Sequence, residues 1–204
     1  MILEENKLYH IYNQGNNRQN IFFSPGNYLF FLKKIKLYVL PHADILAWCL
    51  MPNHFHLLVY VHTLEISDND QTDCNLISGT VRNLNDSIGL ILRTYTRAIN
   101  KQENRSGSLF KTHTKAECVT EIKGITPSFC TTSDEAEIAQ PITEEEYPQI
   151  CFDYIHANPV KAKLVKQPED WEFSSYRDHC GLRNGILISR LRTSALGLKL
   201  STLK

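Results

Sequence analysis

The sequence has no long apolar run and no closely spaced cysteine pair, and these absences exclude several classes of protein. None of its 204 residues lies in an uninterrupted apolar stretch of about 18, so we expect no membrane span and no membrane partner. The N-terminal segment is acidic and then polar, which is unlike a signal peptide. Its six cysteines are scattered without a C-x-x-C, as is typical of free thiols in a reducing cytosol. We therefore expect a cytoplasmic protein.

The chain also lacks an excess of charge of either sign, because 22 Lys and Arg balance 22 Asp and Glu. The distribution is more informative than the sum. Seven basic residues lie between Arg82 and Lys115 against two acidic ones, whereas Ala116 to Asp153 holds nine acidic residues and one lysine. This pattern fits a polyanion-binding segment beside a solvated acidic one. The alternative is two ordinary surface patches.

Apolar periodicity and turn residues predict a single α+β domain over residues 1–204. Strands are expected at Leu8–Asn13, Asp44–Leu50 and His54–Val61, with a fourth near Leu109–Phe110. Helices are expected from Ser24-Pro25 to Pro41, over about Ile77–Asn100, and over Gln149–Ala157, with Pro159 ending the last one. The order β-α-β-β-α-β is that of a ferredoxin-like antiparallel sheet with two helices on one face.

The segments outside these elements are expected to be irregular. Glu65–Asn75 is polar and loop-like, and an acidic insert is predicted at about residues 117–146. Within that insert, Thr143 and Glu146 have the spacing of a capping box ahead of the last helix. A C-terminal extension is expected from about residue 160.

Two histidines in the third predicted strand are the first residues that suggest chemistry. Met51–Val59 reads MPNHFHLLV, and alternate side chains of a strand share a face, so His54 and His56 point the same way. The other face is wholly apolar and should pack under the helices: Phe55, Leu57, Val59 and Val61. Two neutral imidazoles at this spacing can share one divalent ion. The alternative is a pair of partly exposed strand histidines.

The last predicted helix supplies a possible nucleophile and a possible third ligand. Tyr154 and Asn158 are four residues apart and so lie on one helical face. If that face covers the histidines, Asn158 offers a carbonyl oxygen to the ion and Tyr154 places its phenol beside it. A phenol with a pKa of about 10 is a weak nucleophile unless a nearby metal ion polarises the phosphate it attacks. The alternative for Tyr154 is an amphipathic core tyrosine.

Several segments together resemble the IS200-like transposases, and most closely their REP-associated tyrosine transposase branch. The matching stretches occur in family order and run over roughly Tyr9 to Tyr176: YHIYNQGNNRQNIF, AWCLMPNHFHLLV, TYTRAINKQENRSGSLF, YIHANPVKAKLV and DWEFSSY. The pairing of M-P-N-H-x-H-L-L-V with Y-I-x-x-N-P-V-K-A is specific to this group.

The resemblance implies a mechanism and assigns roles to particular residues. His54, His56 and Asn158 would hold Mg²⁺ or Mn²⁺, and Tyr154, on a helix covering the other face of the sheet, would attack single-stranded or hairpin DNA. The products would be a 5′-phosphotyrosine link and a free 3′-hydroxyl, and reversal onto another strand would complete DNA transposition or repeat mobilisation. Such a protein would be nucleoid-associated and would act as a monomer or a homodimer.

Charge and resemblance together also indicate which residues contact DNA. The expected set is Arg18, Arg93, Arg97, Lys101, Arg105, Lys111 and Lys115. The chain departs from the family where Gln14-Gly15-Asn16 replaces a usual R-G-N, and where the link before the tyrosine helix is long and acidic. Two alternatives remain open: a domesticated, catalytically silent nucleic-acid-binding protein, and a structural protein stabilised by zinc.

Overall fold

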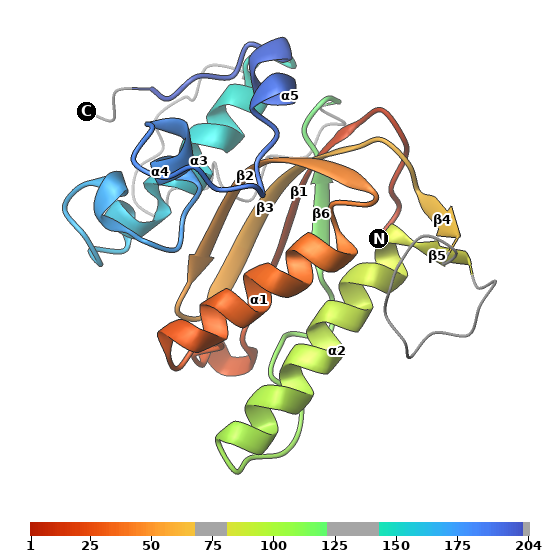
Figure 1. Ribbon diagram of the computed structural model, residues 1–204, viewed down its shortest axis with the longest axis vertical. Coiled ribbons are helices and arrows are strands. Elements are labelled where there is room, and N and C mark those ends of the chain that lie inside the picture. The colour runs from red at the N-terminus through yellow and green to blue at the C-terminus, as the bar shows by residue number, and fades with distance from the viewer. Residues whose placement is uncertain (68–80, 122–142, 202–204) are drawn as a thin grey trace.

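A four-stranded antiparallel sheet forms the centre of the protein. The computed structural model describes residues 1–67, 81–121 and 143–201. The strands are β1 (Leu8–Gln14), β2 (Ala43–Met51), β3 (His54–Val61) and β6 (Lys115–Cys118), paired in the order β2-β3-β1-β6. With α1 (Pro25–Tyr38) between β1 and β2, and α2 (Leu84–Gln102) between β3 and β6, the chain follows the ferredoxin-like order (Figure 1). The predicted α+β fold class is therefore confirmed.

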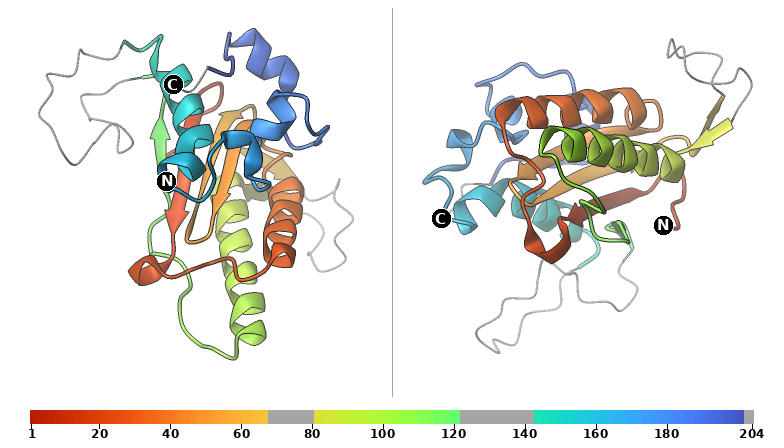
Figure 2. Two further views of the ribbon diagram at one scale, coloured as in Figure 1. Left: turned by 90° about the vertical axis from the view of Figure 1, so that its left-hand side faces the viewer. Right: turned by 90° about the horizontal axis from the view of Figure 1, so that it is seen from below.

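The two faces of the sheet carry different helices. Helices α1 and α2 pack on one face, where β3 contributes Phe55, Leu57, Val59 and Val61 to the main core. Helix α3 (Tyr147–Lys161) covers the other face, where its Cys151, Phe152 and Ile155 pack against Leu58 and β2. Figure 2 shows the sheet between these two helical layers when the molecule is seen from below. The predicted alternation along β3 is confirmed, and it leaves His54 and His56 on the α3 side.

Local side-chain caps fix where the helices begin. Ser24 and Asn27 form a capping box at the start of α1, and the Asn83 side chain accepts a hydrogen bond from the backbone N–H of Asp86 at the start of α2. Thr143 and Glu146 form the predicted reciprocal pair before α3: Thr143 Oγ1 accepts from Glu146 N, and Glu146 Oε2 accepts from Thr143 N. These bonds anchor the helix that carries Tyr154.

The fourth strand and the second helix begin later than predicted. Leu109 and Phe110 are buried core residues, and Phe110 makes only an isolated bridge to Gly15, so β6 starts at Lys115. Helix α2 starts at Leu84 instead of about Ile77, because Val81–Asn83 forms a strand, β5, that pairs with β4 (Glu65–Ser67). Residues predicted as loop from Glu65 thus begin with a short strand. Most of the acidic insert lies outside the described residues.

Pro159 does not end the tyrosine helix, contrary to the prediction. Helix α3 continues to Lys161, and the N–H of Ala162 still donates to the carbonyl of Asn158 at 2.9 Å. Proline has no N–H to donate to the carbonyl four residues earlier, but burial of Ile155 to Pro159 holds the backbone helical despite that loss. The steric preference of the residue before proline is therefore overridden by packing.

The C-terminal segment closes over the outer edge of β2. The N–H of Ser175 donates to Trp48 O and that of Ser189 donates to Ile45 O, both at 2.8–2.9 Å. Two short helices, α4 (Tyr176–His179) and α5 (Arg190–Ala195), lie in this segment. No helix among residues 1–67, 81–121 and 143–201 has the length and apolar character needed to cross a membrane.

Candidate active site

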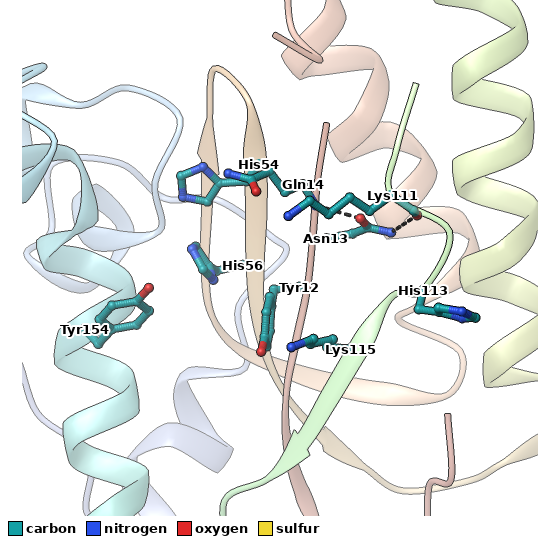
Figure 3. Close-up of a pocket in the computed structure, with 9 residues that line it drawn as sticks. All are labelled: Tyr12, Asn13, Gln14, His54, His56, Lys111, His113, Lys115 and Tyr154. Atoms are coloured by element: carbon teal, nitrogen blue, oxygen red, sulfur yellow. Dashed lines mark hydrogen bonds between the residues drawn. The ribbon is translucent and has the colours of Figure 1, made fainter. Parts of the chain in front are cut away.

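A cavity of about 280 Å³ opens on the histidine face of the sheet. Its walls come from β1, β3, α3 and the segment that leads into β6 (Figure 3). The lining residues are Tyr12, Asn13, Gln14, His54, His56, Lys111, His113, Lys115 and Tyr154. Tyr154 lies on one side of His56, and Tyr12 with Lys115 lies on the other. Aromatic, imidazole and cationic groups from distant parts of the chain therefore meet around one space.

His54 presents an unprotonated nitrogen to the tyrosine helix. Its Nδ1 lies 2.6 Å from Asn53 Oδ1, which can only accept, so the neutral ring carries its proton on Nδ1. Its Nε2 then faces Asn158 Oδ1 at 3.5 Å. The Asn158 amide is oriented by its Nδ2, which donates to the carbonyl of Tyr154 at 3.0 Å. Two electron-pair acceptors thus face each other, an arrangement that a cation would stabilise.

His56 lies deeper and has one nitrogen in use. Its Nδ1 is 2.9 Å from His10 Nε2, and its ring lies edge-on to that of His54 at 4.9 Å between centroids. Its Nε2 is buried and has no hydrogen-bond partner among the residues that the structure describes. Burial, and then the nearby His10 and His54, lowers the pKa of His56 well below its ordinary value. His56 is therefore neutral near pH 7 and has a free electron pair to offer.

The other two imidazoles are neutral for the same reason. Burial lowers the pKa of His54, although the neighbouring Asn158 oxygen opposes the shift. Burial also lowers the pKa of His10 to about 3. Neutral imidazole is the form that binds metal ions, so this protonation state suits a ligand set.

Tyr154 stands over the histidine pair. Its ring lies edge-on to His56 at 5.4 Å and to His10 at 6.0 Å between centroids, and Lys161 Nζ lies 5.6 Å from its ring centroid. Burial raises the pKa of the Tyr154 phenol, an effect that its hydrogen bond with Asn158 opposes. An unassisted Tyr154 is thus a weaker nucleophile than a free tyrosine, and it needs help from the site.

The donor set fits a divalent ion held by two imidazoles and an amide. His56 Nε2 is buried without a partner, and His54 Nε2 faces an amide oxygen at the separation of two ligands that share one ion. No group of three or more His, Cys, Asp or Glu side chains gathers for metal binding within residues 1–67, 81–121 and 143–201. A third protein ligand would therefore come from another residue type, and the Asn158 amide oxygen faces His54 Nε2.

Sequence reasoning missed His10, Tyr12 and Glu117. Tyr12 pairs with His56 in the β1–β3 register, and its hydroxyl donates to Glu117 Oε1 at 2.6 Å. His10 shares the face of Tyr12 because the two are alternate residues of β1. The spacing H-x-Y-x-Q in the first strand carries this signal, but only the pairing of β1 with β3 shows that these side chains adjoin the histidines.

The residues expected to contact DNA are not gathered in one place. Lys111 and Lys115 line the cavity, whereas Arg18 is exposed outside its lining and its carbonyl accepts a hydrogen bond from Asn53. Arg105 donates to Gln19 Oε1 at 2.9 Å. The others lie along the exposed side of α2, on the face of the sheet away from α3: Arg93, Arg97 and Lys101. His113, which the sequence did not single out, also lines the cavity.

Fold and site together define a ferredoxin-like α+β domain whose H-x-H strand lies beneath a tyrosine-bearing helix. The same fold occurs in a REP-associated tyrosine transposase solved bound to a REP hairpin. That structure aligns with a TM-score of 0.55 and 16% identity over 89% of this chain and 83% of the other. A second solved structure, a bacterial tRNA(His) guanylyltransferase-like protein in complex with GTP, aligns with a TM-score of 0.33 and 11% identity over 58% and 57%. No protein-family model matches the chain, and no curated protein matches it significantly in sequence.

Proposed function

We propose that this chain is a metal-dependent, single-tyrosine DNA strand-transfer enzyme of the REP-associated transposase type. One observation carries the proposal: Tyr154 and two neutral imidazoles line one cavity with lysine side chains on its far wall, and the Asn158 amide oxygen faces one of the imidazoles, that of His54. The shared fold with a hairpin-bound tyrosine transposase supports it. The motifs around His54 and Tyr154 support it independently, because they resemble that family in sequence.

The reaction would exchange one phosphodiester for another. The phenolic oxygen of Tyr154 attacks the phosphorus, the bond from phosphorus to the 3′-oxygen breaks, and the downstream strand stays attached as a 5′-phosphotyrosine. The phenol proton is lost, and the departing 3′-oxygen takes up a proton to become a hydroxyl. Because the energy of the broken bond is kept in the new one, attack by a 3′-hydroxyl reverses the step without ATP. The absence of a P-loop sequence agrees with this.

The residues of the chain have separate parts in this scheme. His54, His56 and Asn158 would hold Mg²⁺ or Mn²⁺, which would supply Lewis-acid stabilisation of the charge on the phosphate. Lys111 and Lys115 would bind the strand electrostatically along the far wall. Packing of α3 on β2 and β3 fixes the position of Tyr154 above the pair. Binding in this way would bring the phosphorus within reach of the phenol, which is the main requirement for a positioned nucleophile.

A hairpin library with random single-stranded flanks tests the proposal without knowledge of the target. One portion carries a label at the 5′ end and another at the 3′ end, and both are incubated with the protein and Mn²⁺. We expect the 3′ label to become attached to the protein at the Tyr154 peptide, as mapped by mass spectrometry. The 5′-labelled fragment should be released with a 3′-hydroxyl that a polymerase extends.

Three results would contradict this scheme. A 5′ label on the protein would reverse the polarity, and an adduct on another tyrosine would name a different nucleophile. Tight binding of the library with no adduct in Mn²⁺ or Mg²⁺ would instead support a catalytically silent nucleic-acid-binding protein.

A further inference from the structure

His10 lies behind the histidine pair and is almost completely buried, with 1% of its surface exposed. It sits on β1 opposite Leu58, diagonal to His56 on the same face of the sheet. Its ring stacks on His56 at 5.0 Å and 22°, and on Tyr12 at 4.8 Å and 26°. These contacts hold its Nε2 at 2.9 Å from His56 Nδ1. Two neutral imidazoles therefore share one hydrogen bond, and its proton can lie on either His56 Nδ1 or His10 Nε2.

That proton decides whether His56 can be a ligand. If it sits on His56 Nδ1, His10 Nε2 accepts it, and His56 Nε2 keeps an electron pair directed away from His10. If it sits on His10 Nε2, His56 Nδ1 is the acceptor, and the single proton of His56 must lie on Nε2. A protonated Nε2 cannot bind a metal ion. Only the first arrangement is compatible with a ligand role for His56.

We propose that His10 is a positioning residue that accepts the Nδ1–H of His56 and so holds His56 in the tautomer whose Nε2 can bind a divalent cation. The proposal rests on the proposed function, since it concerns the metal ligands named there. The neighbouring ligand shows the same arrangement: Asn53 Oδ1 accepts the Nδ1–H of His54 at 2.6 Å. The Asn53 amide is itself oriented by its Nδ2, which donates to the Arg18 carbonyl at 3.3 Å. Each histidine thus has its own acceptor behind it, as ligating histidines usually do.

The tautomer of His56 can be measured in the metal-free protein. Long-range ¹H–¹⁵N correlation spectra of ¹⁵N-histidine-labelled protein distinguish a protonated Nδ1 from a protonated Nε2. We expect the Nδ1–H form at His56 in the unaltered chain. A predominant Nε2–H form would overturn the proposal, and this result requires neither a variant nor a metal.

Mn²⁺ affinity, measured by calorimetry, gives the second test. His10→Phe removes the acceptor and keeps a ring, so we expect binding to weaken by about 10- to 100-fold, the range typical of lost outer-shell partners. His10→Gln can place an amide oxygen near the position of Nε2, and its affinity should stay close to that of the unaltered protein. Unchanged affinity in His10→Phe would refute the role of His10.

His42→Phe is a matched control for His10→Phe. His42 is also fully buried, and its Nε2 is hydrogen-bonded to Ser87 Oγ at 3.1 Å, in the layer between the sheet and α2. Its substitution should lower stability by a comparable amount without changing Mn²⁺ affinity. An equal loss of affinity in the control would show that His10 acts only through general stability. Failure of the unaltered protein to bind Mn²⁺ would contradict the metal part of the proposed function, and the tautomer measurement would still decide the role of His10.

Discussion

His54 and Asn158 are 104 positions apart in the sequence, yet His54 Nε2 and Asn158 Oδ1 face each other at 3.5 Å. The first begins β3 and the second lies near the end of α3, so the contact exists only because α3 crosses the histidine face of the sheet. His54 Nε2 is an acceptor because the ring proton lies on Nδ1, bonded to Asn53, and Asn158 Oδ1 is oriented by the bond from Nδ2 to the Tyr154 carbonyl. A cation between them would relieve the repulsion of their electron pairs.

Asn158→Ala should therefore affect metal binding more than folding. The Asn158 side chain donates to the Tyr154 carbonyl and also bonds to the Tyr154 phenol, so we expect the metal-free free energy of unfolding to fall by about 1 kcal/mol. Mn²⁺ affinity should fall about tenfold or more. Urea unfolding with and without saturating Mn²⁺ measures both, since a tenfold loss removes about 1.4 kcal/mol of the stabilisation by the ion. An undiminished stabilisation would exclude Asn158 as a ligand.

Tyr154→Phe should abolish the covalent adduct and cleavage while leaving DNA affinity and fold nearly unchanged. Phenylalanine keeps the ring packed against His56 and loses only the attacking oxygen. Tyr95→Phe is the contrasting variant, because Tyr95 is fully buried and its hydroxyl donates to the Ile21 carbonyl at 2.8 Å. That variant should lose about 1 kcal/mol or more of stability and retain cleavage. Normal cleavage by Tyr154→Phe would show that another group is the nucleophile.

Neutralising the two cavity lysines should weaken DNA binding more than neutralising two arginines of α2. Lys111→Gln with Lys115→Gln removes positive charge from the cavity wall, whereas Arg93→Gln with Arg97→Gln removes the same charge from the exposed side of α2. For single-stranded DNA, each lost phosphate contact should reduce the slope of log affinity against log salt by about 0.7. Salt titrations by fluorescence anisotropy measure both slopes. Equal changes of the salt slope in the two double variants would show that the α2 face contacts DNA as much as the cavity wall does.

Acid should destabilise the fold through its buried histidines, and the contribution of His42 can be measured separately. Burial lowers the pKa of His42 from its ordinary value of about 6.5. As the pH falls below about 6.5, the unfolded chain takes up a proton that folded His42 does not, so the free energy of unfolding decreases. The decrease continues until the pH reaches the lowered pKa. His42 should thus contribute a slope of at most about 1.4 kcal/mol per pH unit.

His42→Phe should remove that contribution. Urea unfolding between about pH 7 and pH 5 is expected to give a shallower decline in the variant than in the unaltered protein. The variant will retain part of the decline, because the pKa of buried His156 is also lowered by burial. Parallel declines in the two proteins would mean that His42 is protonated in the folded state, contrary to its environment.

Strong local patterns made much of the fold predictable. The strand His54–Val61 has the observed bounds, because its strict alternation leaves one apolar face and a turn precedes it. The first strand and first helix were likewise marked by turn residues and a proline at the helix start. Strand β6 was misplaced because it is an edge strand: Lys115 and Glu117 are polar, and the apolar pair Leu109–Phe110 serves the core without forming a ladder.

The candidate site was less predictable than the fold. The i, i+2 and i, i+4 spacings identified His54, His56, Tyr154 and Asn158, but only the register of β1 against β3 shows that His10 and Tyr12 adjoin them. Register is a long-range property, set by packing across the whole sheet. Charge counts along the sequence also do not show that the basic residues of α2 lie on the face of the sheet away from α3.

The alternation along β3 means that substitutions and insertions in this strand have different effects. Its odd-numbered residues hold the α1–α2 core, and its even-numbered histidines face the cavity. Point substitutions can therefore alter one face and leave the other intact. Insertion of a single codon within the strand cannot, because it would reverse the faces of all residues on one side of it relative to those on the other. The length of this strand between its turn and its last residue should consequently tolerate no insertions or deletions, even where individual positions vary freely.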